Sequence, residues 1–94
     1  MEYEWDADKA EVNLQKHGVA FDTVHAFDWE CAITMVDRRW DYGEERVIAM
    51  SLLAHRLHVL VFTVRNGGTV RIISLRKANA REVALYEKAT GTSE

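Results

Sequence analysis

Hydrophobic and polar positions in the first third of the chain are spaced as in helices. Apolar side chains recur every three to four positions after Asp6, a residue suited to capping a helix start, and the pattern stops at Gly18. This spacing predicts a helix over residues 7–17. Asp22 offers a second cap, and the apolar residues after it predict a short helix over residues 22–28.

The rest of the chain is dominated by β-branched and aromatic residues, in short runs separated by turn-forming residues. We expect four strands, over residues 31–36, 46–53, 58–65 and 69–76. Asn66-Gly67-Gly68 separates the last two and predicts a hairpin, because a tight turn needs positive φ at its centre. Asn79 can cap a closing helix that runs to about Ala89.

This order of elements predicts an α+β domain. The N-terminal helices and the C-terminal helix would pack on a four-stranded antiparallel sheet, and the length of 94 residues predicts a single domain over residues 1–94. The absence of proline, repeats and linker-like segments in the sequence fits this organisation.

A two-residue turn in the hairpin would divide its side chains between two faces. The expected core face carries Leu60, Phe62, Ile73 and Leu75, with His58, Arg71 and Lys77 nearer the ends. The expected substrate face carries Val59, Val61, Thr63, Arg65, Val70, Ile72, Ser74 and Arg76. A three-residue loop with a bulge would break this division.

The composition indicates an ordinary folded protein, with 48% hydrophobic and 29% charged residues. Cys31 is the one cysteine and cannot form an internal disulfide, which fits a reducing cytoplasm. The acidic N-terminal segment does not resemble a signal peptide, and no apolar run is long enough to span a membrane. We therefore expect a cytoplasmic location and no membrane partner.

The net charge of -3 hides a strong asymmetry along the chain. Residues 1–53 contain five basic and twelve acidic side chains, whereas residues 54–94 contain seven basic and three acidic. The segment from Arg46 to Arg81 contains seven Lys and Arg residues and no Asp or Glu. This segment is a candidate surface for phosphate groups, although its arginines can equally well pair with the acidic half.

The motifs of several enzyme classes are absent from the sequence. There is no HExxH, no Gly-rich phosphate loop and no carboxylate pair in the basic half, so we expect no bound metal and no cofactor. Arg, Lys, His and Tyr side chains remain, and they suit RNA because RNA supplies its own nucleophile, the 2′-hydroxyl. The residues by themselves predict a basic α+β module that binds a polyanion.

Several of these candidates have a structural interpretation as well. His17 can simply favour the negative end of a helix, and Arg71 can pair with acidic side chains. Tyr86 can be a core residue whose hydroxyl reaches the surface. Arg76-Lys77 is harder to explain in this way, because two adjacent cations repel each other unless an anion is near.

Three ordered motifs make the chain similar to the BrnT family of toxins. They are Trp5-Asp6, Lys9-Ala10, Asn13, Lys16-His17-Gly18-Val19 and Phe21 at the head; Gly43-Glu44-Glu45-Arg46 in the middle; and Arg71 to Ala78, Arg81-Glu82 and Tyr86-Glu87 at the tail. The sequence departs from the family pattern at Leu75 and at Val83-Ala84, which puts full RNA affinity in doubt.

The resemblance implies a RelE-like ribonuclease that cuts RNA, inhibits translation and arrests growth. It also implies a DNA-binding antitoxin of the BrnA type as partner, and contact with operator DNA only through the antitoxin complex. The alternative is a non-catalytic member that binds the antitoxin or regulates the operon.

The resemblance also suggests which residues form the active centre. The candidate catalytic residues are Lys16, His17, Arg65, Arg76 and Lys77, and the candidate RNA-binding residues are Arg46, Arg71, Arg81 and Tyr86. We expect Arg65 and Arg76 to hold the scissile phosphate, because a guanidinium matches its geometry. His17 or Lys77 would then transfer protons.

Overall fold

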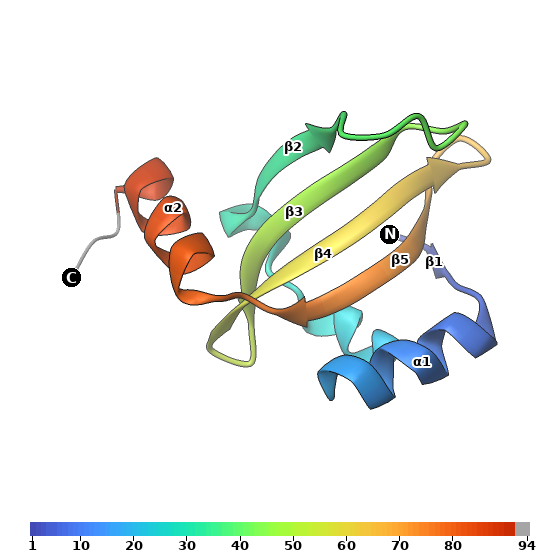
Figure 1. Ribbon diagram of the computed structural model, residues 1–94, viewed down its shortest axis with the longest axis horizontal. Helices are drawn as coiled ribbons and strands as arrows, with labels where there is room; N and C mark the ends of the chain where they lie inside the picture. The colour runs from blue at the N-terminus through green and yellow to red at the C-terminus, as the bar shows by residue number, and fades with distance from the viewer. Residues whose placement is uncertain (92–94) are drawn as a thin grey trace.

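The computed structural model describes residues 1–91 and contains one mixed five-stranded sheet in the order β1-β5-β4-β3-β2 (Figure 1). The elements in chain order are β1 (Tyr3–Glu4), α1 (Ala7–His17), the 3₁₀ helices η1 (Phe21–Ala26) and η2 (Trp29–Cys31), β2 (Ile33–Asp37), β3 (Arg46–Leu53), β4 (Arg56–Arg65), β5 (Thr69–Lys77) and α2 (Ala80–Thr90). The α+β class is confirmed. Residues 92–94, which the predicted domain includes, lie outside the described residues.

Helix α1 has the predicted bounds, and its two ends show why. The Asp6 side chain accepts hydrogen bonds from the backbone N–H groups of Asp8 and Lys9, at 2.9 and 3.1 Å. Gly18 adopts a left-handed conformation with φ of 72°, and its N–H donates to the carbonyl of Leu14 at 2.8 Å.

The second predicted helix differs from the structure in type and length. Instead of an α-helix over residues 22–28, the chain forms η1, which Asp22 does not cap, and then η2. The Asp28 side chain accepts hydrogen bonds from the first N–H groups of η2. These tight turns delay the start of the next strand to Ile33, two residues after the predicted start.

The predicted four-stranded antiparallel sheet is wrong in one respect: a fifth strand, β1, is added at its edge. Tyr3 pairs with Val70 and Glu4 with Arg71, and this contact is parallel. A strand of two residues is too short to show the alternation by which strands are recognised in a sequence.

The hairpin between β4 and β5 has the predicted turn but not the predicted register. Asn66 and Gly67 have φ values of 50° and 75°, and the N–H of Gly68 donates to the carbonyl of Arg65 at 3.0 Å. Arg65 nevertheless pairs with Thr69, so that three residues separate the strands. The predicted division of faces therefore fails next to the turn.

A β-bulge restores the predicted register farther along the hairpin. Phe62 pairs with Ile72 while Val61 pairs with Ser74, which leaves Ile73 as the extra residue. Val70 and Ile72 are consequently buried in the core, whereas Arg71 lies on the opposite face. Both outcomes reverse the prediction for these positions.

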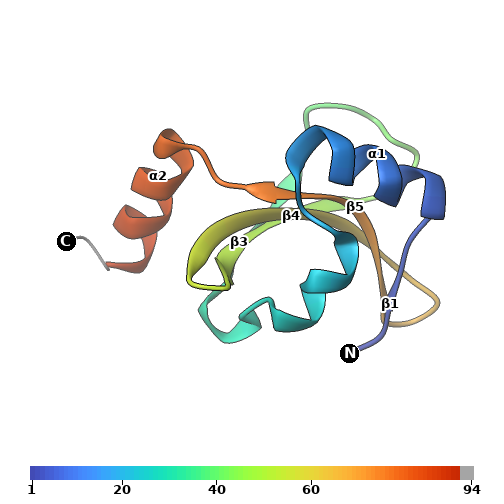
Figure 2. The same ribbon diagram turned by 90° about the horizontal axis from the view of Figure 1, so that it is seen from below.

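The segment between α1 and β2 covers one face of the sheet. The main core joins this segment to the sheet, and its buried members are Val19, Phe21, Val24, Phe27, Ala49, Leu53, Leu60, Phe62, Val70, Ile72 and Leu75. Figure 2 shows η1 and η2 on one side of the sheet and α1 on the other. We call the side on which α1 lies the open face; it carries Thr63, Arg71, Ser74 and Arg76.

Helix α2 covers the far end of the open face. Asn79 and Glu82 form a reciprocal capping box, as the predicted start of this helix implies. A second cluster beneath the helix contains Met50, Leu57, Val59, Ala78 and Tyr86. Val59, predicted to face substrate, is thus covered by α2.

A candidate RNA-cleaving site on the open face

Helix α1 and strand β5 enclose a shallow pocket of about 310 Å³ at the edge of the open face. Lys16 and His17 line it from the last turn of α1, and Ile73 and Ser74 line it from β5. The bulge turns Ile73 toward α1 rather than into the core. Two predicted catalytic residues therefore share one pocket with the predicted substrate strand.

The side chain of Asn13 fixes α1 to this edge of the sheet. It is buried, its Nδ2 donates to the carbonyl of Leu75 at 2.8 Å, and its Oδ1 accepts from the N–H of Leu75 at 3.2 Å. The same amide nitrogen donates to the carbonyl of Val19 at 3.0 Å. β1 pairs only with Val70 and Arg71, so the backbone of Leu75 has no strand on this side, and the Asn13 side chain satisfies its N–H and C=O groups instead. These hydrogen bonds place the last turn of α1 beside β5.

His17 lies in an environment that disfavours its charged form. Partial burial lowers the pKa of its imidazole, and the positive charges of Lys16 and Arg76 lower it further. The imidazole is therefore neutral over a wider range of pH than a free histidine and can accept a proton.

Arg76 projects from β5 onto the open face and is held by a carboxylate. Its Nη1 and Nη2 donate to the two oxygens of Glu82 at 2.8 and 2.7 Å, and its side chain is 32% exposed. These hydrogen bonds raise the pKa of Arg76, against opposing effects of burial and of the charge on Arg39. The guanidinium is therefore oriented and partly accessible to an anionic ligand.

Arg65 lies too far from Arg76 to share a phosphate with it. Arg76 pairs with Val59, and Arg65 is six residues farther along β4, a separation of about 20 Å at ~3.3 Å per residue. Arg65 instead approaches Glu44 at 3.6 Å. The expected joint contact of Arg65 and Arg76 with one phosphate is therefore wrong, because the hairpin places them at opposite ends.

Lys77 lies on the other side of the sheet from Arg76. It pairs with His58, and both line a hollow together with Gly18 and Val19, on the side that η1 covers. Adjacent strand positions point to opposite faces, so Arg76 and Lys77 do not face one anion together.

The arginines predicted to bind RNA lie in different surroundings. Arg46 stacks over the Tyr42 ring with 3.9 Å to its centroid and approaches Glu44 at 3.4 Å. Arg71 pairs with Glu4 at 3.0 Å, which agrees with the structural interpretation of this residue. Arg81 is exposed in the first turn of α2.

Tyr86 occupies a structural position. Its side chain is 8% exposed, and its hydroxyl donates to the carbonyl of Cys31 at 2.6 Å. Burial is the main cause of the raised pKa of this phenol. This placement favours packing of α2 over the RNA contact expected for Tyr86.

Four residues that shape the site were not among the predicted ones. Asn13 and Glu82 position His17 and Arg76, while Asp37 and Arg39 form a bidentate pair with hydrogen bonds of 2.9 Å. Asn13 and Glu82 had a signal in the sequence, because both stand in the quoted family motifs and the spacing of Glu82 from Asn79 also fits a capping box. Asp37 and Arg39 had none.

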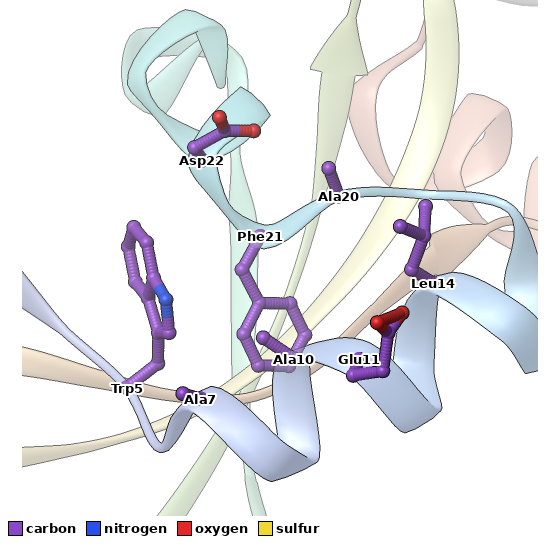
Figure 3. Close-up of a pocket in the computed structure, with 8 residues that line it drawn as sticks. All are labelled: Trp5, Ala7, Ala10, Glu11, Leu14, Ala20, Phe21 and Asp22. Carbon is purple, nitrogen blue, oxygen red and sulfur yellow. The ribbon is translucent and has the colours of Figure 1, made fainter.

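A second pocket, between α1 and η1, has unsuitable chemistry for a phosphate. Figure 3 shows Trp5, Phe21 and Leu14 in its wall, and the carboxylates of Glu11 and Asp22 are its charged groups. The lining contains no Lys, Arg or His. The pocket of His17 is lined by Lys9, Lys16 and one carboxylate, Asp8, and therefore suits a polyanion better than this one.

Residues 1–91 contain neither a candidate membrane span nor a candidate metal cluster. No helix in this range is long and apolar enough to span a membrane. No three His, Cys, Asp or Glu side chains of the same residues gather in a way that could hold a metal ion.

The open-face pocket and the neighbouring Arg76 supply complementary chemical groups. A neutral imidazole at His17 can accept a proton, Arg76 can hold a phosphate oxygen, and Lys16 supplies a second positive charge. This combination suits cleavage of a phosphodiester that carries its own nucleophile.

Comparison with known proteins leads to the same chemistry. A crystal structure of the ribonuclease toxin BrnT of Brucella abortus, at 1.1 Å, is similar to the chain with a TM-score of 0.58 and 20% identity, over 84% of this chain and 97% of that one. No curated protein matches by sequence. Residues 5–82 match the family model described as the ribonuclease toxin, BrnT, of type II toxin-antitoxin systems. The chain therefore belongs to the BrnT family of ribonuclease toxins.

Proposed function

We propose that this chain is an endoribonuclease that cleaves RNA at the open-face pocket without a metal ion. The observation that carries the proposal is the pocket lined by Lys16 and His17, with Arg76 close enough for its charge to lower the pKa of His17, in a member of a ribonuclease toxin family. Growth arrest and inhibited translation follow from loss of RNA. The RelE-like relationship implied by the resemblance stays a prediction.

In the proposed mechanism, His17 acts as the general base. Its neutral imidazole takes the proton of a 2′-hydroxyl, and the freed oxygen attacks the neighbouring phosphorus. Arg76, oriented by Glu82, binds a non-bridging oxygen and stabilises the extra charge of the phosphorane.

Lys16, which lies beside His17 in the last turn of α1, completes the reaction. Its ammonium protonates the leaving 5′-oxygen as the bond to phosphorus breaks, so that the products are a 2′,3′-cyclic phosphate and a 5′-hydroxyl. The RNA would extend from the pocket toward the hairpin turn. Its phosphates farther along the chain would there meet the arginines near that end of the sheet, Arg46, Arg65 and Arg71.

We further propose that a DNA-binding antitoxin of the BrnA type neutralises the chain. Membership of a type II toxin-antitoxin family implies an antitoxin partner, and operator DNA would be contacted only through the complex. An antitoxin that covers the open face would block the pocket and the arginines together.

The test uses purified protein and a single-stranded RNA in the presence of EDTA. We expect cleavage that leaves 2′,3′-cyclic phosphate ends, and no cleavage of an oligonucleotide whose 2′-hydroxyls are methylated. His17→Ala and Arg76→Ala should each reduce the rate at least about 100-fold, in the range typical of a lost general base or oxyanion donor. Lys88→Ala removes an exposed charge from α2 and should leave the rate unchanged.

Two results would redirect the proposal. Full activity of both variants would show that the pocket is not the active centre. Absence of cleavage by the folded wild type, with binding of the antitoxin retained, would favour the alternative of a non-catalytic module that binds the antitoxin or regulates the operon.

A further inference from the structure

The segment between β2 and β3, residues 38–45, presents an exposed indole. The side chain of Trp40 is 71% exposed, more than any other large hydrophobic residue except Met1 among residues 1–91. Arg38 and Arg39 precede it and are exposed as well. Aromatic rings beside guanidinium groups form the usual surface on which bases of single-stranded nucleic acids stack.

This segment is braced from beneath by one buried carboxylate. The Asp37 side chain is 2% exposed and accepts two hydrogen bonds of 2.9 Å from the Arg39 guanidinium. It also accepts from the N–H of Arg39 and from the hydroxyl of Tyr42, each at 3.1 Å. Trp40 therefore lies between Arg39 and Tyr42, which are both held by Asp37. Its indole is exposed although the residues around it are fixed by hydrogen bonds.

The braced segment lies on the same side of the sheet as the candidate site. Asp37 pairs with Arg46 and shares the open face with Thr63 and Arg71, by the alternation along β2, β3 and β4. Figure 2 shows the segment rising from the sheet on the side on which α1 lies. The charge of Arg39 is also close enough to affect Arg76.

There is room for a base beside the indole. The segment encloses a hollow of about 400 Å³, lined by Val36, Arg38, Arg39 and Trp40 and by the carboxylates of Asp37, Asp41, Glu44 and Glu45. Two of these carboxylates are already paired with arginines, Asp37 with Arg39 and Glu44 with Arg46 and Arg65. A base stacked on Trp40 would belong to the same strand whose phosphate reaches Arg76.

We propose that Trp40 is a base-stacking residue for single-stranded RNA bound across the open face. The inference rests on the proposed ribonuclease function and adds to it a contact that selects unpaired RNA. A duplex keeps its bases stacked inside the helix, so a ring at this position discriminates against double-stranded substrate.

The test measures binding of a single-stranded RNA whose 2′-hydroxyls are all methylated, so that it is not cut. Trp40→Ala should weaken binding roughly 5- to 150-fold, the range that one stacked base contributes, while Trp40→Phe should keep most of the affinity. Leu85→Ala removes an exposed apolar side chain from α2 and should not change it. Because Trp40 is exposed, we expect thermal unfolding of its variants to match the wild type.

A spectroscopic readout separates stacking from a general loss of binding. Stacked bases quench indole fluorescence, so RNA should quench wild-type emission and leave that of Trp40→Phe unchanged at saturation, since Trp5 and Trp29 pack against the core. Equal binding by wild type and Trp40→Ala, with RNA cleavage intact, would overturn the stacking role alone. A wild type that neither binds nor cleaves RNA would overturn the proposed function as well.

Discussion

Replacement of Asn13 by alanine tests whether one amide side chain holds α1 to the sheet. The native side chain makes three hydrogen bonds, two to the backbone of Leu75 and one to the carbonyl of Val19, in a buried environment. Alanine keeps the helix propensity but leaves these backbone groups without partners.

The expected loss of unfolding free energy is about 3–5 kcal/mol. A buried N–H group without a partner costs roughly 1–3 kcal/mol, and each of the two carbonyls loses about 1 kcal/mol of net hydrogen bonding. A domain of this size has a total stability near the lower end of about 5–15 kcal/mol, so a large share of it would be lost.

Urea denaturation measures this effect, with an unchanged m-value as the sign that the same surface unfolds. Gln15→Ala is the matched control, because it removes an exposed amide from the same helix and should change stability by less than about 0.5 kcal/mol. A stability of Asn13→Ala within about 1 kcal/mol of the wild type would refute the anchoring role. Weak RNA cleavage by the folded fraction of this variant would show displacement of His17.

Three further predictions concern titration and packing. Arg76→Gln should raise the pKa of His17 in an NMR titration and move the acid limb of the cleavage profile to higher pH, because one of the charges that lower this pKa is removed. The hydrogen bonds with Arg76 are the main cause of the lowered pKa of Glu82. The contribution of the Glu82 carboxylate to the unfolding free energy should therefore be complete above pH 4.5 and disappear as the pH falls through the lowered pKa. In Glu82→Gln, the unfolding free energy measured against pH should lack this decrease. Tyr86→Phe should lose about 1 kcal/mol in urea denaturation, since the hydrogen bond to the Cys31 carbonyl is removed.

The sequence predicts the elements of this fold better than it predicts their partners. The caps at Asp6, Gly18 and Asn79 act locally, and the helices that they bound are found where they were predicted. The bulge at Ile73 depends on a competition between turn geometry and burial of Ile72, which no local pattern shows. The reversed faces at residues 70–73 follow from the three-residue turn, and the bulge ends the reversal.

The candidate site was predicted only in part, because its geometry also depends on contacts that no local pattern shows. His17 and Arg76 were identified by residue type and family motif, and the structure brings them close enough for the charge of one to affect the other. Arg65 was grouped with them on the family resemblance, although it is next to the hairpin turn and Arg76 is at the far end of the hairpin. Asp37 gave no signal, because an acidic residue at a strand end resembles any solvated carboxylate until its partner is known.

The anchoring of α1 has a consequence for the order of biosynthesis. Asn13 and Leu75 are 62 positions apart, so the helix that carries Lys16 and His17 waits for β5 before it can dock. A nascent chain that ends before β5 lacks both Arg76 and the backbone that holds α1 in place. The pocket of His17 is therefore completed only when most of the polypeptide has been made.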